Sequence, residues 1–481
     1  MQKTISEILY STNTSKTKFS KDIGISKSFV IDVINGKKKC SKSMYEKIRN
    51  LSYVSEHYKS ELDNAFFSNK YGKKEYDLML QTLDELNNYD NTFLNSQKLY
   101  IRYDFMKNLF SADEVAHTIN GKTEFLEIVS YLCEKSLSES NPFFISNFSF
   151  EMTELESVLF TLFRDRDYSK ELYFEHIVSL NEDYSNTLNT FFKALKWGRI
   201  LLITKKTSCL TEFSNQLLPY YIILNDGVLF FDDSLEHAIV YKSKNLIDYH
   251  VRLFKEKDFN TTVLSEIIYD ETQCVGQTDT YANVDHLYLS FGGTPCLGPY
   301  ADYDVLNNIA KDIPYKDQLI RMFIAHYANL FDMQRNEYIS ESSYWNFVEN
   351  GKMNVITEKF VNPCSPSDRV DILKSILNAN TNNESIRLFD KSKLEIPENL
   401  SFDCFESSTI ITSIFDNEPC TTFVKPYCTT INVDYSEFFW FKSLINSLKN
   451  YFEENNFLLS SDANKRAFKR MIAKCEGMQN N

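Results

Sequence analysis

The stretch from Lys16 to Gly36 constrains the fold of this chain more than any other part of the sequence. Phe19 and Ile23 lie four residues apart, so both face the same side of a first helix. Gly24 follows at a point where a residue without a Cβ permits a tight left-handed turn. Ser26 is placed to cap a second helix with its hydroxyl. The stretch therefore predicts two helices joined by a tight turn.

The second helix of this pair carries its apolar side chains on one face. Val30, Val33 and Ile34 recur at positions i, i+3 and i+4, and this face is expected to pack against the first helix. Asn35 and Gly36 then end the helix, because both residue types tolerate the left-handed conformation of a helix C-terminus. These residues predict the core of a small helical domain.

The same packing leaves a polar face of the second helix exposed. Lys27, Ser28 and Asp32 are not needed by the core and lie near the start of this helix. A run of lysines from Lys37 to Lys39 follows the helix directly. In a helix-turn-helix such a face enters the major groove of DNA, with the residues at the helix start nearest the base edges.

The pattern resembles the DNA-binding domain of the Cro and lambda-repressor (Xre-like) family of bacterial and phage regulators. The match rests on Phe19-Ser20, on the turn Ile23-Gly24-Ile25-Ser26, and on an eight-residue helix closed by Asn35-Gly36 and basic residues. It covers roughly the first 55 residues, about a ninth of the chain. The family often has a proline before its fourth helix, where this chain has Cys40.

The resemblance implies that double-stranded operator DNA is the partner. By position it assigns base contacts to Lys27, Ser28 and Asp32. It assigns phosphate contacts to a second set: Lys16, Asn35, Lys37, Lys38 and Lys39. The Asp32 carboxylate either accepts a hydrogen bond from a cytosine N4 amino group or disfavours close approach to DNA. The alternative to a DNA-binding domain is an ordinary helical hairpin with a solvated lysine run.

Charge is distributed unevenly along the chain. Residues 1–50 hold eleven Lys and Arg against four Asp and Glu, a net charge of +7, and the remaining 431 residues carry −21. A basic head attracts phosphate locally. An acidic body is repelled by DNA and is better suited to sensing or assembly.

The length of 481 residues allows several domains. We expect a helix-turn-helix DNA-binding domain at 1–55 and a helical linker or dimerisation region at 56–140. In the latter, residues 76–86 predict an amphipathic helix with Leu80 and Leu83 inside. An α+β module is expected at 141–275, and a helical segment plus a second α+β module at 276–481. The predicted fold class is therefore multidomain, with a small all-α head, a helical region and α+β C-terminal modules.

Two parts of the body show the same order of predicted elements. Residues 188–254 and 369–452 each indicate a helix, a strand, further strands and a closing helix. In the first of them, Asp226-Gly227 is a strong signal for a tight hairpin. We interpret this order as a candidate internal duplication of an α+β module.

Catalytic and metal-binding signatures are absent from the sequence. It contains no GxxxxGK[ST], HExxH or GxSxG, its seven histidines are dispersed, and its ten cysteines include no CxxC. Asp302 and Asp304 form either a cation site or a solvated acidic loop, and Gly292-Gly293 marks a domain boundary or the rim of a pocket. No catalytic residue, metal ligand or cofactor is predicted.

The N-terminus lacks the apolar core of a signal peptide, and no run approaches the length of a membrane span. We expect a cytoplasmic transcription regulator that binds DNA as a homodimer and has no membrane partner. Its acidic body would dimerise, bind a small-molecule or peptide effector, or do both. Two alternatives remain: a DNA-tethered protein-interaction component of the antitoxin or phage-defence type, and an enzyme that lacks recognisable motifs.

Overall fold

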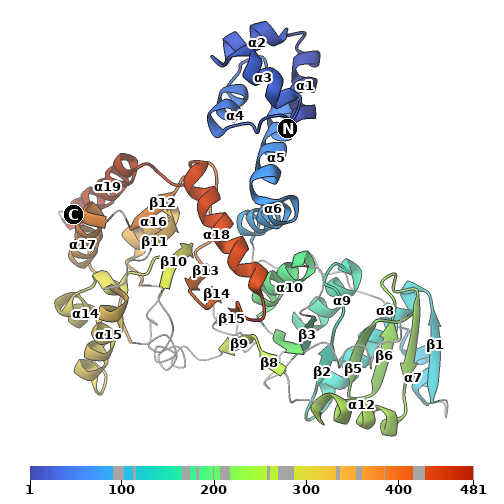
Figure 1. Ribbon diagram of the computed structural model, residues 1–481. Helices are drawn as coiled ribbons and strands as arrows, with labels where there is room; N and C mark the ends of the chain where they lie inside the picture. Colours follow the sequence, from blue (N-terminus) through green and yellow to red (C-terminus); the bar gives the residue numbers. More distant parts are fainter. Residues whose placement is uncertain are drawn as a thin grey trace. The chain divides into compact units, whose positions relative to one another are not determined.

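The chain folds as a mixed α+β protein, in which a helical N-terminal region is followed by two mixed β-sheets interleaved with helices (Figure 1). This confirms the fold class predicted from the sequence. The chain divides into two compact units, Met1–Leu83 with Asn446–Leu448, and Asp84–Ile445 with Lys449–Asn481. The computed structural model describes residues 1–89, 102–111, 115–164, 174–179, 184–198, 200–205, 217–256, 261–268, 287–331, 336–353, 360–383, 385–414 and 428–479.

The first unit begins with four short helices, and two longer helices follow them. Ile5, Phe19, Val30, Met44 and Ile48 are completely buried and form the core of the four short helices. The helix pair, the intervening turn and the apolar spacing predicted for residues 16–36 are thereby confirmed. The helices are α1 (Gln2–Ser11), α2 (Lys16–Asp22), α3 (Lys27–Ile34), α4 (Lys42–Arg49), α5 (Glu56–Tyr71) and α6 (Lys73–Asn87).

Helix α6 buries one of the two leucines that the sequence placed inside. Leu83 is buried as expected, but Leu80 is 38% exposed, whereas Met79 is fully buried. Tyr76, Met79 and Leu83 define the buried face, and Leu80 is turned about 100° away from Met79 around the helix. The prediction for Leu80 was wrong because two leucines three residues apart do not by themselves fix which side of a helix is covered.

The second unit contains an eight-stranded sheet in the order β1-β7-β6-β5-β2-β3-β4-β8. Strands β2, β3 and β4 are parallel, and the other pairs are antiparallel. Helices α7 (Tyr103–Ser111), α8 (Lys122–Ser138), α9 (Thr153–Arg164), α10 (Tyr184–Trp197) and α12 (Lys244–Glu256) accompany the sheet. The strands are β1 (Ala116–Asn120), β2 (Phe144–Ser146), β3 (Phe174–Ser179), β4 (Ile200–Lys205), β5 (Tyr220–Leu224), β6 (Gly227–Phe231), β7 (His237–Tyr241) and β8 (Thr261–Val263).

The same unit contains a seven-stranded sheet in the order β12-β11-β10-β13-β14-β15-β9. Its strands are β9 (Ser265–Ile268), β10 (Leu287–Gly292), β11 (Asn336–Ser340), β12 (Ile386–Phe389), β13 (Leu400–Phe405), β14 (Ser408–Ile414) and β15 (Cys428–Asp434). The accompanying helices are η2 (Gly298–Tyr300), α14 (Tyr303–Ile309), α15 (Lys316–Phe331), α16 (Glu341–Asn350), α17 (Pro366–Asn383), α18 (Phe439–Glu454) and α19 (Ser461–Gln479).

Six strands of each sheet follow the same topology. The first sheet contains the order β7-β6-β5-β2-β3-β4, and the second contains β15-β14-β13-β10-β11-β12. In each, three parallel strands are followed along the chain by an antiparallel meander that pairs with the first of them. The repeated order that the sequence indicated is therefore present in the sheets. Both repeats begin earlier than expected, at β2 and β10.

Residues 261–268 join the two sheets, because β8 pairs with β4 and β9 pairs with β15. Between β8 and β9, the N–H of Leu264 donates to the carbonyl of Leu202 at 2.8 Å, and its own carbonyl accepts from the N–H of Asn432 at 2.7 Å. Helix α10 adds aromatic contacts across the junction, with the ring of Phe191 lying 5.5 Å from that of Phe438. The sheets therefore belong to one packed body.

The glycine pair at the end of β10 serves backbone packing. A Cβ on Gly292 would lie 2.6 Å from the carbonyl oxygen of Leu400, and one on Gly293 would collide with the carbonyl of Pro397. This close approach, and not a domain boundary or a pocket rim, accounts for the glycines. Within the described ranges, none of the helices combines the length and the apolar composition that crossing a membrane requires.

Candidate nucleic-acid interface

Helices α3 and α4 begin at serine caps. The Ser26 hydroxyl accepts a hydrogen bond from the N–H of Phe29 at 3.4 Å, as the sequence predicted. The Ser41 hydroxyl accepts from the N–H of Met44 at 3.2 Å, so Ser41 is the cap of α4. These bonds satisfy N–H groups that have no partner within the helix and fix where each helix starts.

The turn between α2 and α3 depends on Gly24. Its φ of +60° is in the left-handed region that side chains with a Cβ rarely adopt. The N–H of Gly24 donates to the carbonyl of Lys21, and that of Ile25 donates to the carbonyl of Ser20, both at 3.0 Å. The left-handed turn predicted at this glycine is confirmed.

The C-terminus of α3 turns the lysine run back toward the helix. Gly36 has a φ of +74°, and its N–H donates to the carbonyl of Val33 at 3.1 Å. The N–H groups of Lys37 and Lys38 both donate to the carbonyl of Asp32, at 2.8 and 3.2 Å. This pattern is a Schellman motif, which satisfies free carbonyls at a helix end. It sets the direction in which Lys37 and Lys38 leave α3.

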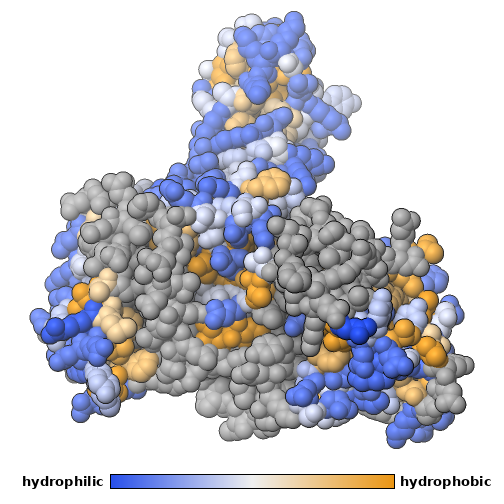
Figure 2. Space-filling model, turned by 60° about the horizontal axis from the view of Figure 1, so that its bottom comes forward, coloured by the Kyte–Doolittle hydropathy of each residue, from blue (hydrophilic) through white to orange (hydrophobic). Residues whose placement is uncertain are grey.

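All residues assigned to DNA contact from the sequence lie at the surface of the head. Asp32 is partly exposed, and the others are exposed: Lys16, Lys27, Ser28, Asn35, Lys37, Lys38 and Lys39. The base-contact residues share α3, the three lysines follow it directly, and Lys16 starts α2. In the view of Figure 2, the visible face of the N-terminal helices is largely hydrophilic. The structure thus gathers a basic polar surface around one exposed helix.

Lys38 differs from its two neighbours because it forms an ion pair. Its ammonium lies 3.1 Å from the Asp32 carboxylate and 5.1 Å from the centre of the Phe29 ring. Among the described residues, no ion pair engages the ammonium groups of Lys37 and Lys39. Sequence reasoning missed Phe29, although its place three residues before Asp32 and outside the core spacing could have indicated it.

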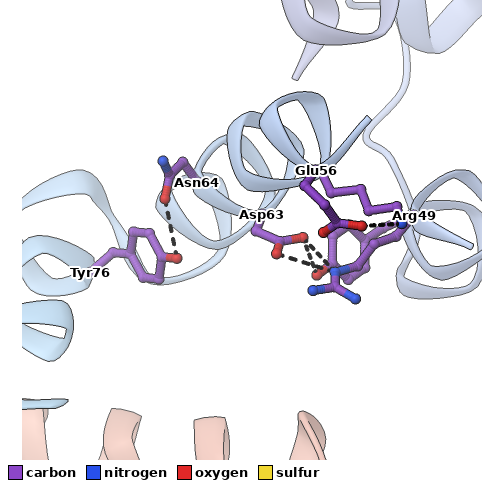
Figure 3. A network of polar contacts seen from close by, with 7 residues as sticks. Arg49, Glu56, Asp63, Asn64 and Tyr76 are labelled. Atoms are coloured by element: carbon purple, nitrogen blue, oxygen red, sulfur yellow. Dashed lines mark hydrogen bonds and ion pairs between the residues drawn. The ribbon is translucent and has the colours of Figure 1, made fainter. Parts of the chain in front are cut away.

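Helix α5 is bonded to α4 of the head. The Asp63 carboxylate accepts from the Arg49 guanidinium at 3.0 Å (Figure 3). It also accepts from the Tyr45 hydroxyl at 2.7 Å. The hydrogen bond to Asp63 raises the pKa of Arg49. The ring of Tyr45 also stacks on that of Phe66, with the two ring centres 4.2 Å apart. The helix that follows residue 55 is therefore packed on the basic head.

A second bond links the turn after α4 to α2. The Tyr53 hydroxyl donates to the Asp22 carboxylate at 2.9 Å. Burial of the phenol, together with this bond, raises the pKa of Tyr53 to about 12. Tyr53 therefore keeps donating up to a higher pH than an ordinary tyrosine, whose pKa is about 10.

The sequence also left a cation site open in the body, at Asp302 and Asp304. The part of the chain that the structure describes contains no group of three or more His, Cys, Asp or Glu able to hold a metal ion. Asp302 caps α14, because its carboxylate accepts from the N–H of Val305 at 2.9 Å. Asp302 and Asp304 are both exposed, so the structure agrees with the solvated acidic segment that the sequence left open and adds a capping role for Asp302.

Comparisons with known proteins do not assign the chain to a family. No protein-family model and no curated protein matches it. One similar solved structure is that of TrmBL2, described as an archaeal chromatin protein with a novel mode of DNA binding. It has 10% sequence identity and a TM-score of 0.21, and the match covers 48% of this chain and 81% of that one. Another is polyphosphate kinase from Porphyromonas gingivalis, at 11% identity and a TM-score of 0.20, covering 81% and 57%. TM-scores this low establish neither a shared fold nor a shared function.

Proposed function

We propose that this protein is a sequence-specific DNA-binding transcription regulator whose acidic body dimerises or binds an effector. The observation that carries the proposal is the exposed basic surface of α3 and of the residues that follow it. The turn at Gly24 and the cap at Ser26 fix this helix in the head. A small basic domain attracts phosphate, and an exposed helix of this kind fits the major groove.

The residues divide into two roles. Lys27 and Ser28 lie in the first turn of α3, and Asp32 lies one turn further along, so these three side chains face the base edges. Phosphate contacts are assigned to a set around the helix ends: Lys16, Asn35, Lys37, Lys38 and Lys39. Phosphate contacts set position and affinity, whereas base contacts set sequence preference.

The proposed regulator acts as a homodimer on a two-fold operator. Dimeric helix-turn-helix proteins bind half-sites about one helical turn apart. The residues after position 50 carry a net charge of −21, which opposes binding of the body itself to DNA. The body is therefore free to hold two heads together or to respond to a ligand that shifts their arrangement.

Selection of binding sites from random double-stranded DNA by the full-length protein, followed by salt titration, tests the proposal. A two-fold motif is expected. If four lysines per head each neutralise one phosphate, a dimer should give a slope of about −7 in log K against log salt concentration. Weak binding without sequence preference would refute the proposal and would favour a head that only tethers a protein-interaction component.

Two matched variants separate the assigned roles. Ser28→Ala keeps every charge, so it should change the preferred sequence and leave the salt slope unchanged. Lys39→Met removes one exposed ammonium, so it should weaken binding to all sequences and reduce the slope by about one per head. An equal loss on every sequence for Ser28→Ala would contradict its role in reading bases.

A further inference from the structure

The fold holds Lys38 on the same side of α3 as the base-contact residues. The N–H of Lys38 donates to the carbonyl of Asp32 at 3.2 Å, which anchors its backbone to the helix. The ammonium then lies 3.1 Å from the carboxylate of Asp32 and 5.1 Å from the centre of the Phe29 ring. The side chains remain accessible, with Lys38 52% and Asp32 30% exposed. The pair therefore offers a hydrogen-bond acceptor and a donor side by side on an exposed face.

This spacing matches the major-groove edge of one G·C base pair. Cytosine presents its N4 amino group, a donor, next to guanine O6, an acceptor. These two atoms are hydrogen-bonded to each other within the base pair, so they lie about 2.9 to 3.0 Å apart. The Asp32 carboxylate and the Lys38 ammonium, 3.1 Å apart, have the complementary order and nearly the same separation.

An A·T pair fits the same two groups less well. It also places an amino donor beside a carbonyl acceptor, but adenine N7 is an acceptor next to the amino group and would face the carboxylate. On the thymine side, the C5-methyl group lies beside the only acceptor open to the ammonium. Guanine instead gives the ammonium two acceptors, O6 and N7. The chemistry therefore favours G·C, with cytosine at Asp32 and guanine at Lys38.

We propose that Asp32 and Lys38 read a single G·C base pair in each operator half-site as one unit. This proposal rests on the proposed function, and it moves Lys38 from the phosphate contacts to the base contacts. A phosphate-contacting lysine strengthens binding to every sequence, whereas this lysine strengthens binding to one base pair. The proposal also explains why an acidic residue, Asp32, lies on the DNA-facing helix: it recognises a base.

The test compares the full-length wild type with Asp32→Asn and Lys38→Met in selections from random DNA. The wild type should select one G·C pair per half-site that depends on both residues. Asp32→Asn should change the preferred cytosine to adenine, because an amide pairs with adenine N6 and N7. Lys38→Met should lower discrimination at the same base pair by about 5- to 150-fold, the range that one good base contact supplies.

A chemical probe and a matched variant complete the experiment. In N4-methylcytosine a methyl group replaces the N4 hydrogen that would donate a hydrogen bond to Asp32. This replacement should weaken DNA binding by the wild type but not by Asp32→Asn. Glu46→Gln is the matched control. It removes the carboxylate that lies 3.9 Å from the ammonium of Lys42, so it breaks an ion pair of another head lysine, on α4. It should keep the wild-type motif.

The outcomes distinguish failure of this inference from failure of the proposed function. A selected motif that is unchanged in both variants would overturn the paired reading and leave a DNA-binding regulator. Uniform weakening of all sequences by Lys38→Met would return Lys38 to the phosphate contacts and would also overturn it. A wild type that selects no motif would refute the proposed function itself.

Discussion

Acidification is expected to destabilise the body through His176 of β3. This imidazole is 2% exposed, and its Nδ1 lies 2.9 Å from the hydroxyl of Ser146. The centres of the Phe148 and Phe150 rings lie 5.3 and 4.8 Å from the centre of the imidazole. Burial lowers the pKa of His176 to about 3 from its ordinary value of 6.5. The imidazole therefore stays neutral in the folded protein while the unfolded chain takes up a proton.

The sign and the size of the effect follow from this difference. The stability is fully present above the unfolded pKa of about 6.5 and is lost as the pH falls toward the folded pKa of about 3. Between pH 7.5 and pH 5.5 the protonation of the unfolded chain at one histidine lowers the free energy of unfolding by about 1.4 kcal/mol. Any folded pKa well below 5.5 gives the same loss, because the folded imidazole is neutral at both pH values.

Urea unfolding followed by tryptophan fluorescence measures the loss. The three tryptophans of the chain, Trp197, Trp345 and Trp440, all belong to the second compact unit, so the signal reports on the body. The wild type should lose about 1.4 kcal/mol more than His176→Gln between the two pH values, because glutamine does not titrate.

The control is His57→Gln, a change in the first compact unit at a side chain that is 74% exposed. It should show the same pH dependence of the fluorescence transition as the wild type. Equal losses for the wild type and His176→Gln would refute the reasoning, because proton uptake at His176 could then not be the source.

Substitutions at three further positions test the packing. Gly24→Ala should destabilise the head by about 1 to 2 kcal/mol because its φ is +60°, and Gly24→Asn should cost less; hydrogen exchange of α2 and α3 measures both. Phe191→Ala removes a fully buried ring at the junction of the two sheets and should cost about 3 to 5 kcal/mol, seen as a lower urea midpoint in tryptophan fluorescence. Gly293→Ala drives a Cβ into the carbonyl of Pro397 and should cost about 1 to 3 kcal/mol in the same assay, and an unchanged midpoint would contradict the packing role of this glycine.

Two of the strands that the sequence did not indicate, β3 and β11, carry buried polar residues. Strand β3 contains His176, which is 2% exposed, and β11 contains Glu337, which is 1% exposed. Each is the middle strand of its parallel triplet. A strand with both faces covered is normally recognised by a continuous apolar run, and a charged or titratable residue interrupts that signal. By contrast, β5 and β6 are almost wholly apolar around a turn ending in Gly227, and both were predicted.

The sequence by itself determined the local features of this protein: the helices and turn of the head, the cap at Ser26, the left-handed glycines and the concentration of positive charge in the first 50 residues. These depend on neighbours a few residues apart, so spacing and residue type are sufficient to predict them. Only the tertiary structure decided which side of α6 is buried, why Gly293 is a glycine, and how the two sheets are joined. It also decided that Lys38 turns back onto Asp32 and Phe29. These features depend on which surfaces meet, and residue spacing along the chain does not specify that contact.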